Sequence, residues 1–189
     1  MPETLRQLHE EHRNIARLLG ALERQLAIFE EAGRPDYDIL LSIAEYFTGF
    51  PDRHHHPKED LVLAKLRQRD AEAAHTVGEL GAEHQRLDEL ARHFREAVEN
   101  VLKEAEVPRA NIDAVIRHFI ADQRRHMQME EAHFFPLAER TLTAEDWAAV
   151  DAEAGKADDP LFGDACSSEF AALRDDILRW EREDQTGKV

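Results

Sequence analysis

The two halves of the sequence carry imidazole and carboxylate side chains in one repeated order. Each half has a histidine, then a second histidine that is followed four residues later by a glutamate. The two histidines are 43 residues apart in the first half and 42 in the second. A step of four residues puts two side chains on the same helix face, about one turn apart. The repeated residues are His12, His55 and Glu59, then His84, His126 and Glu130.

These side chains have the chemistry of a site for two metal ions. On helices that face one another they offer imidazole nitrogens and two carboxylates, which suits paired iron or manganese ions in a bundle core. A buried carboxylate without a partner loses hydration worth on the order of several kcal/mol, and a divalent cation compensates for that loss. A single buried histidine is more often a core residue than a ligand, but matched positions in both halves favour ligation. We therefore predict two iron ions bridged by the carboxylates, while zinc also accepts these donors.

Apolar residues at alternating steps of three and four predict the helices that carry these donors. The first such seam runs from Leu5 to Phe29 and includes His12. Pro51 and Pro57 should kink the second helix, and no stretch alternates apolar and polar residues as a strand does. We predict an all-α fold, an antiparallel up-down four-helix bundle, with long helices over residues 5–29, 40–69, 80–101 and 108–142.

The last part of the sequence predicts shorter helices beyond the bundle. Thr143 and Asp146 form the start of a capping box, and a short helix should follow it. A final amphipathic helix around Ile177 should pack across the bundle. We expect residues 1–140 to form the bundle domain and residues 141–189 to form a C-terminal helical extension that packs on it.

The composition limits which classes of partner and which cellular compartment fit the protein. The chain of 189 residues has 24 basic and 40 acidic residues, a net charge of -16 that disfavours nucleic acid and anionic lipid. No apolar run approaches the roughly 20 residues of a membrane span, and the first residues do not resemble a signal peptide. Cys166 is the only cysteine, so the chain forms no internal disulfide. We expect a cytoplasmic protein, monomeric or homodimeric, with no nucleic-acid or membrane partner.

Several other polar residues lie near the predicted donors. His133 follows Glu130 by three residues and either contacts a ligand, lines a channel or simply packs. Asp88 follows His84 by four residues and either orients that imidazole or faces water. We expect the remaining histidines to be surface groups or to support the ligands from outside; they are His9, His54, His56, His75, His93 and His118.

The segments that carry the donors resemble the hemerythrin-like, or HHE cation-binding, family. They are EEH at His12, HHPKED at His55, AEH at His84 and HMQMEE at His126, and the resemblance spans roughly residues 1–140. It implies an antiparallel four-helix bundle with a non-heme di-iron centre that meets dioxygen, nitric oxide or peroxide.

The sequence departs from the oxygen-carrying members of that family in two ways. Those carriers have a fifth histidine one turn from the ligand on the third helix, where this chain has Asp88 on one side and Leu80 on the other. Their last carboxylate falls five residues after its histidine, which would select Glu131. The repeated four-residue step favours Glu130, and Glu131 stays the alternative.

Three classes of function remain open. We favour a non-heme di-iron protein that binds dioxygen or nitric oxide, as a sensor, scavenger or iron-handling protein. The alternative is a di-iron oxidoreductase or an iron–sulfur-centre repair protein in oxidative or nitrosative stress, for which no dedicated substrate or electron-donor motif is visible. The third is a signalling module whose tail, from about Thr143, changes its packing when the metal changes state.

Overall fold

Helices account for all the regular structure that the computed structural model describes. The described residues are all but 32, 104–107, 156–157 and 188–189, and no strand occurs among them. The elements are α1 (Glu3–Glu30), α2 (Tyr37–Phe47), η1 (Pro51–His55), α3 (His56–Arg69), α4 (Ala71–His75), α5 (Leu80–Leu102), α6 (Arg109–Met129), η2 (Glu130–Phe134), α7 (Phe135–Thr141), α8 (Ala144–Ala154) and α9 (Ala171–Gln185).

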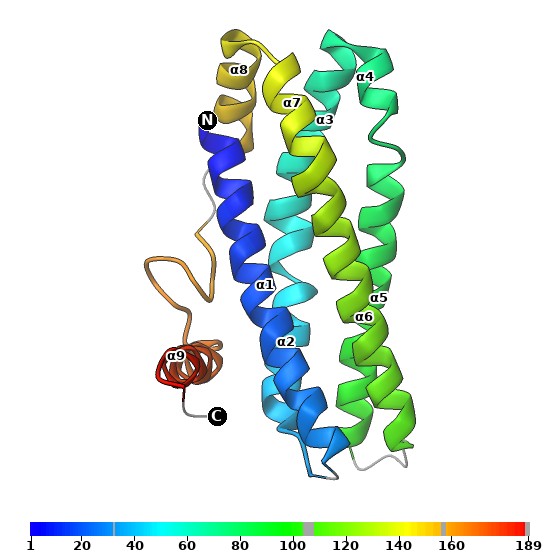
Figure 1. Cartoon of the computed structure of the whole chain (residues 1–189), viewed down its shortest axis with the longest axis vertical. Coiled ribbons are helices and arrows are strands. Elements are labelled where there is room, and N and C mark those ends of the chain that lie inside the picture. Colours follow the sequence, from blue (N-terminus) through cyan, green and yellow to red (C-terminus); the bar gives the residue numbers. More distant parts are fainter. Residues whose placement is uncertain (32, 104–107, 156–157, 188–189) are drawn as a thin grey trace.

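The long helical segments lie side by side along the long axis of the molecule (Figure 1). They are α1, the continuous run from α2 through η1 to α3, α5, and the run from α6 through η2 to α7. α5 packs against α2 and α6, and α1 packs against α6. The predicted all-α bundle is thereby confirmed as a helical bundle. In the described part, no helix has an apolar stretch long enough to cross a membrane.

The hydrophobic core is divided in two by a layer of buried polar side chains. On α1, Leu5 and Leu8 belong to one apolar cluster, Ile15 and later residues belong to the other, and His12 lies between them. Each of the other long segments also passes from one apolar cluster to the other at the place where its predicted donors lie. The apolar layers therefore hold the helices together on both sides of the polar one.

The helix carrying each His-x-x-x-Glu motif widens into one π-helical turn beside its donors. In η1 the amide of His56 donates to the carbonyl of Pro51, and in η2 the amide of Phe135 donates to that of Glu130. Each turn ends two residues before a proline, Pro57 or Pro136. Since proline lacks an N–H and crowds the preceding turn, it disfavours a regular α-helical turn there. The irregularity predicted at Pro51 and Pro57 takes the form of a π turn that ends at His55, and the second half has its counterpart before Pro136.

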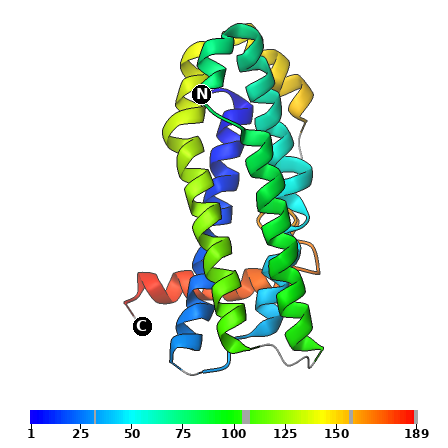
Figure 2. The ribbon, with the colours of Figure 1, turned by 90° about the vertical axis from the view of Figure 1, so that its right-hand side faces the viewer.

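The C-terminal part packs on the outside of the bundle. The capping box of Thr143 and Asp146 opens α8, as predicted, and α8 packs against α1 and α3. α9 contacts α1 and α2 and runs across the long axis, which is clearest in Figure 2. The division into domains at residue 140 stays a prediction.

A buried carboxylate fastens the segment between α8 and α9. Asp159 accepts hydrogen bonds from the Tyr46 hydroxyl at 3.0 Å and the Asn14 amide at 3.1 Å. It also accepts from the backbone amides of Leu161 and Phe162, each at 2.9 Å.

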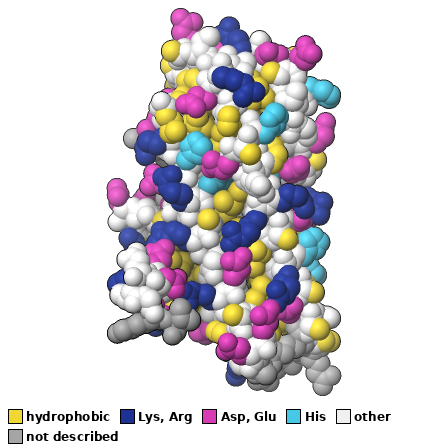
Figure 3. All heavy atoms as spheres, viewed as in Figure 1, with side chains coloured by type: hydrophobic (Ala, Val, Ile, Leu, Met, Phe, Trp, Pro, Cys, Tyr) yellow, Lys and Arg dark blue, Asp and Glu magenta, His cyan; other side chains and the backbone are white. Residues whose placement is uncertain are grey.

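Charged side chains also join α9 to the bundle, since Arg17 on α1 forms an ion pair with Glu181 on α9. On the face in Figure 3, acidic and basic side chains are interspersed rather than gathered by sign.

Candidate metal centre

The structure brings all six predicted donors into the buried polar layer. They come from α1, from η1 and α3, from α5, and from α6 and η2, so every long segment contributes. None of the six residues is more than 6% exposed. The residues are His12, His55, Glu59, His84, His126 and Glu130.

Glu59 directs one carboxylate oxygen toward His12 and His55 and the other oxygen toward His84. Oε1 of Glu59 lies 3.7 Å from Nε2 of His12 and 3.4 Å from Nε2 of His55, while its Oε2 lies 3.3 Å from Nε2 of His84. A carboxylate placed in this way can bridge two cations, one per oxygen.

Glu130 mirrors that arrangement from the opposite segment. Its Oε2 lies 3.3 Å from Nε2 of His12, and its Oε1 lies 3.0 Å from Nε2 of His126 and 3.7 Å from Nε2 of His84. The donors accordingly form two groups of facing atoms, within 4.8 Å of one another in each group. One contains His12 and His55 with both glutamates, and the other contains His84 and His126 with Glu59.

The atoms that face the middle of this layer lack hydrogen-bond partners among the described residues. Both oxygens of Glu59 and of Glu130 are buried and make no hydrogen bond, and neither does Nε2 of His12, His84 or His126, although these oxygens and nitrogens lie 3.0–3.7 Å from one another. Buried polar atoms are otherwise almost always paired, because leaving them unpaired costs about 1–3 kcal/mol each. A set of oxygens and imidazole nitrogens that converge without partners fits divalent or trivalent metal ions.

The protein's own charges perturb these groups strongly. Burial opposes protonation of His12, but the Glu130, Glu131 and Glu59 carboxylates outweigh it and raise the pKa of this imidazole to about 10. The same balance, with Glu130 and Glu59, raises the pKa of His84 to about 10. Burial alone would raise the pKa of Glu130, yet the surrounding imidazoles hold it well below its ordinary value. The surrounding imidazoles therefore keep Glu130 ionised and able to meet a cation.

Three of the four donor imidazoles hydrogen-bond a second carboxylate through Nδ1, whereas Nδ1 of His84 lies 3.4 Å from Asp60 without a hydrogen bond. Such a partner fixes the ring orientation and makes the metal-facing nitrogen a better donor. The Nδ1-to-carboxylate distances are 2.8 Å from His12 to Glu131, 2.8 Å from His55 to Glu11, 3.1 Å from His126 to Glu83 and 3.4 Å from His84 to Asp60.

The structure also places Glu131, the alternative to Glu130, and His133, whose role the sequence left open. Glu131 is 40% exposed and contacts His9 and His12 from outside, whereas Glu130 points inward. His133 contacts the hydroxyl and carbonyl of Thr76 rather than a donor residue.

Asp88 forms an ion pair with Arg92, one turn along α5. It does not orient His84, whose Nδ1 faces Asp60 instead.

His56 is buried. Of the two positions predicted for it, the one at the surface is wrong, because the residue is only 7% exposed and lies in the group formed by Glu59, His84 and His126. The position that supports the ligands from outside stays a prediction. Burial, and then the neighbouring imidazoles of His84, His55 and His126, hold the pKa of His56 well below the ordinary value. The three-residue step from His56 to Glu59 places both on one helix face and would have indicated its burial.

A buried ion pair beside His55 was also missed. Glu11 accepts a hydrogen bond from the Lys58 ammonium and contacts Nδ1 of His55, and both Glu11 and Lys58 are buried. Glu11 precedes His12 on the apolar seam of α1, three residues after Leu8, which is a signal of burial. Its pairing with a lysine from α3 needed the tertiary structure.

With this geometry in place, comparison with known families is decisive. The model of the hemerythrin HHE cation-binding domain matches residues 3–138. The chain belongs to this family. The matched range includes all six donors of the buried polar layer. No curated protein and no solved structure matches the chain.

Proposed function

We propose that this hemerythrin HHE protein holds two iron ions in its polar layer and binds dioxygen or nitric oxide there. In this proposal the bundle is an antiparallel up-down four-helix bundle in the cytoplasm. His12 and His55 hold one ion, His84 and His126 hold the other, and both glutamates are shared, which completes the six donors described above.

One observation carries the proposal: Glu59 and Glu130 each present one oxygen to each group of histidines. A structural hydrogen-bond network would pair those oxygens with N–H groups, but none of the four has a hydrogen-bond partner among the described residues. Two cations placed between the histidine groups would satisfy all of them at once.

The surroundings favour a small ligand. The donors are almost fully buried between two apolar clusters, and this burial disfavours direct contact with a bulky substrate. Imidazole and carboxylate donors suit iron, which supplies redox chemistry and open coordination positions for a diatomic molecule.

The chain's own residues orient the donors and exclude water. Glu131, Glu11 and Glu83 hold Nδ1 of three imidazoles, which leaves Nε2 free to face the layer. Phe135 stacks on His12 with ring centroids 5.2 Å apart and covers it from the side. Dioxygen and nitric oxide are small and weakly polar, so an apolar cover of this kind admits them more readily than it admits ions.

The test compares two adjacent glutamates after anaerobic iron loading. Wild type should take up about two irons per chain and develop oxo-bridged ferric absorption in air, and Glu130→Gln should lose both. Glu131→Gln, the matched control, should keep two irons because Glu131 acts from outside. Loss in Glu131→Gln with retention in Glu130→Gln would reverse the assignment, and a wild type that binds no iron would refute the proposal.

A second measurement tests the ligand. Nitric oxide added to the reduced, iron-loaded protein should give the optical and magnetic signature of an iron nitrosyl, and Glu59→Gln should diminish it in proportion to its iron. A loaded protein that is indifferent to both nitric oxide and dioxygen would contradict the small-ligand role while leaving metal binding intact.

A further inference from the structure

The supporting carboxylates of the metal centre follow the internal repeat. In the first half, the residue before the first donor histidine is Glu11, and its carboxylate lies 2.8 Å from Nδ1 of His55. In the second half, the residue at the same place is Glu83, and its carboxylate lies 3.1 Å from Nδ1 of His126. Both halves therefore use the same contact to orient the ring of their second donor histidine.

The repeat is broken three residues after each of these second histidines, where the first half has Lys58 and the second half has Met129. Lys58 is only 3% exposed, and its ammonium donates a hydrogen bond to Glu11. Met129 is partly buried and packs against the smaller apolar cluster. The Glu83 side chain is 51% exposed and forms no ion pair with a lysine or arginine of the described chain. Of the two supporting carboxylates, Glu11 alone has an ammonium beside it.

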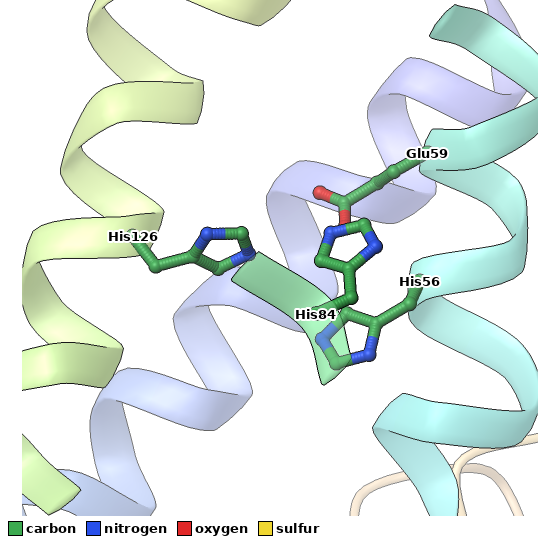
Figure 4. A group of neighbouring side chains, drawn as sticks. All are labelled: His56, Glu59, His84 and His126. Atoms are coloured by element: carbon green, nitrogen blue, oxygen red, sulfur yellow. The ribbon is translucent and has the colours of Figure 1, made fainter. Parts of the chain in front are cut away.

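The fold does not require a charge at the position of Lys58. The second half shows that an unbranched apolar side chain fits the equivalent place, and a buried ion pair that is replaced as a whole by apolar residues often leaves a protein equally stable. Lys58 is the neighbour of Glu59, whose carboxylate reaches toward His84 inside the polar layer (Figure 4). The Lys58 ammonium instead contacts Glu11, on the Nδ1 side of His55. Its charge is thus placed next to the metal centre without occupying it.

The ammonium offsets the negative charge that Glu11 places behind His55. A carboxylate at Nδ1 makes an imidazole a stronger donor through Nε2. Glu11 contacts His55 through Oε2 and Lys58 through Oε1, so the two partners compete for the charge of one carboxylate. All three residues are buried, and charges in a poorly hydrated interior act on one another more strongly than charges in water. The charge of Lys58 therefore bears on any cation that His55 holds.

We infer that Lys58 is a positioning residue for the iron held at His55: its ammonium, acting through Glu11, weakens donation by the His55 ring and favours the ferrous ion. This inference rests on the proposed function, because it concerns one of the two proposed iron ions. Loss of the ammonium should favour ferric iron, loss of the carboxylate should favour ferrous iron, and loss of both should largely cancel. Dioxygen binds to ferrous iron, so Lys58 helps to keep the centre in the state that takes this ligand.

The reduction potential of the iron-loaded protein tests the sign of this effect. Lys58→Met introduces the residue that the repeat has in the other half, and at the wild-type midpoint it should raise the ratio of ferric to ferrous iron about tenfold, which lowers the midpoint by about 59 mV. Glu11→Gln should shift the midpoint in the opposite direction, and the double variant should lie between the two. Lys65→Met, the control, removes a half-buried lysine of the same helix and should match wild type.

The opposite signs separate a charge effect from a structural one. A residue that only stabilises the fold alters unfolding, but it gives no reason for the two single variants to move the potential in opposite directions. Equal midpoints in Lys58→Met and wild type, or shifts of both single variants in the same direction, would overturn the inference.

Zinc provides a readout that involves no redox change. It accepts imidazole and carboxylate donors, and competition with a coloured chelator measures its affinity for the metal-free protein. Because the ammonium repels a cation at His55, Lys58→Met should bind zinc about tenfold more tightly than wild type, whereas Glu11→Gln should bind it about tenfold more weakly. Unchanged or weaker zinc binding in a Lys58→Met variant with wild-type helical content would contradict the inference.

The double variant covers the case in which Lys58→Met alone does not fold. Adding Lys58→Met to Glu11→Gln removes the ammonium without leaving a buried carboxylate unpaired, and it should lower the midpoint from the Glu11→Gln value toward that of wild type; a midpoint that does not fall would also overturn the inference. The proposed function fails differently, because wild type itself would then not hold two irons, and zinc competition would still test Lys58. Wild type with two irons whose potential is indifferent to Lys58 contradicts this inference alone.

Discussion

The buried ion pair of Lys58 and Glu11 should stabilise the metal-free fold, and the free energy of unfolding that is lost on breaking it can be estimated. In Lys58→Met the straight side chain is kept but the ammonium is lost, so Glu11 stays buried as an anion with only Nδ1 of His55 beside it. Breaking a buried ion pair from one side costs about 3–5 kcal/mol. Glu11 also lines a cavity of about 540 Å³, through which water can reach it. We therefore expect Lys58→Met to lower the free energy of unfolding by about 3 kcal/mol, the low end of that range.

Urea unfolding of the chelator-treated protein measures this cost. A loss of about 3 kcal/mol lowers the melting temperature of a chain of this size by roughly 6–12 °C. Lys65→Met, on the same helix, removes a half-buried lysine whose ammonium lies 3.5 Å from the side-chain oxygen of Gln68, and it should change stability by less than about 0.5 kcal/mol.

The double variant Glu11→Gln with Lys58→Met shows whether the stability loss comes from the unpaired charge or from lost side-chain packing. It removes both charges together, so its loss should be smaller than that of Lys58→Met alone, with a coupling of about 1–3 kcal/mol. If Lys58→Met unfolds at the wild-type urea concentration, or if the two single losses simply add, the reasoning about this buried pair is refuted.

Three further predictions concern the extension, the pH dependence and the π turns. Asp159→Ala removes the acceptor that holds the segment before α9 and should cost about 2–4 kcal/mol and speed proteolysis of the extension; exposed Asp164→Ala should do neither. In the apoprotein the raised pKa values of His12 and His84, about 10 against 6.5, stabilise the fold below pH 6.5, and this contribution should disappear as pH rises toward 10. Equal urea midpoints at pH 7 and pH 10 would contradict it. Pro136→Ala restores a backbone N–H after η2, and should weaken iron retention against a chelator by allowing a regular α turn at Glu130; unchanged retention would argue against a role for the π turn.

Helical periodicity was enough to predict the elements and the inward position of the six donors. A side chain that repeats at steps of three and four with leucines must face the same side as they do, which applies to His12 on α1. The capping box at Thr143 was equally local, since its two partners are three residues apart.

Contacts between helices were the part that periodicity could not predict. The carboxylate behind each imidazole comes from another segment: Glu131 reaches His12 from η2, and Glu83 reaches His126 from α5. Such pairs depend on helix rotation and axial offset, which a single sequence does not fix. The burial of His56 was different, because its three-residue step to Glu59 is visible in the sequence.

The central claim is that two iron ions lie between Glu59 and Glu130. Crystals of the iron-loaded protein, measured at the iron absorption edge, test it most directly through anomalous scattering. We predict two peaks roughly 3.5–4 Å apart, one beside His12 and His55 and the other beside His84 and His126. A single peak, or iron bound elsewhere on the acidic surface while this layer stays free of it, would contradict the account.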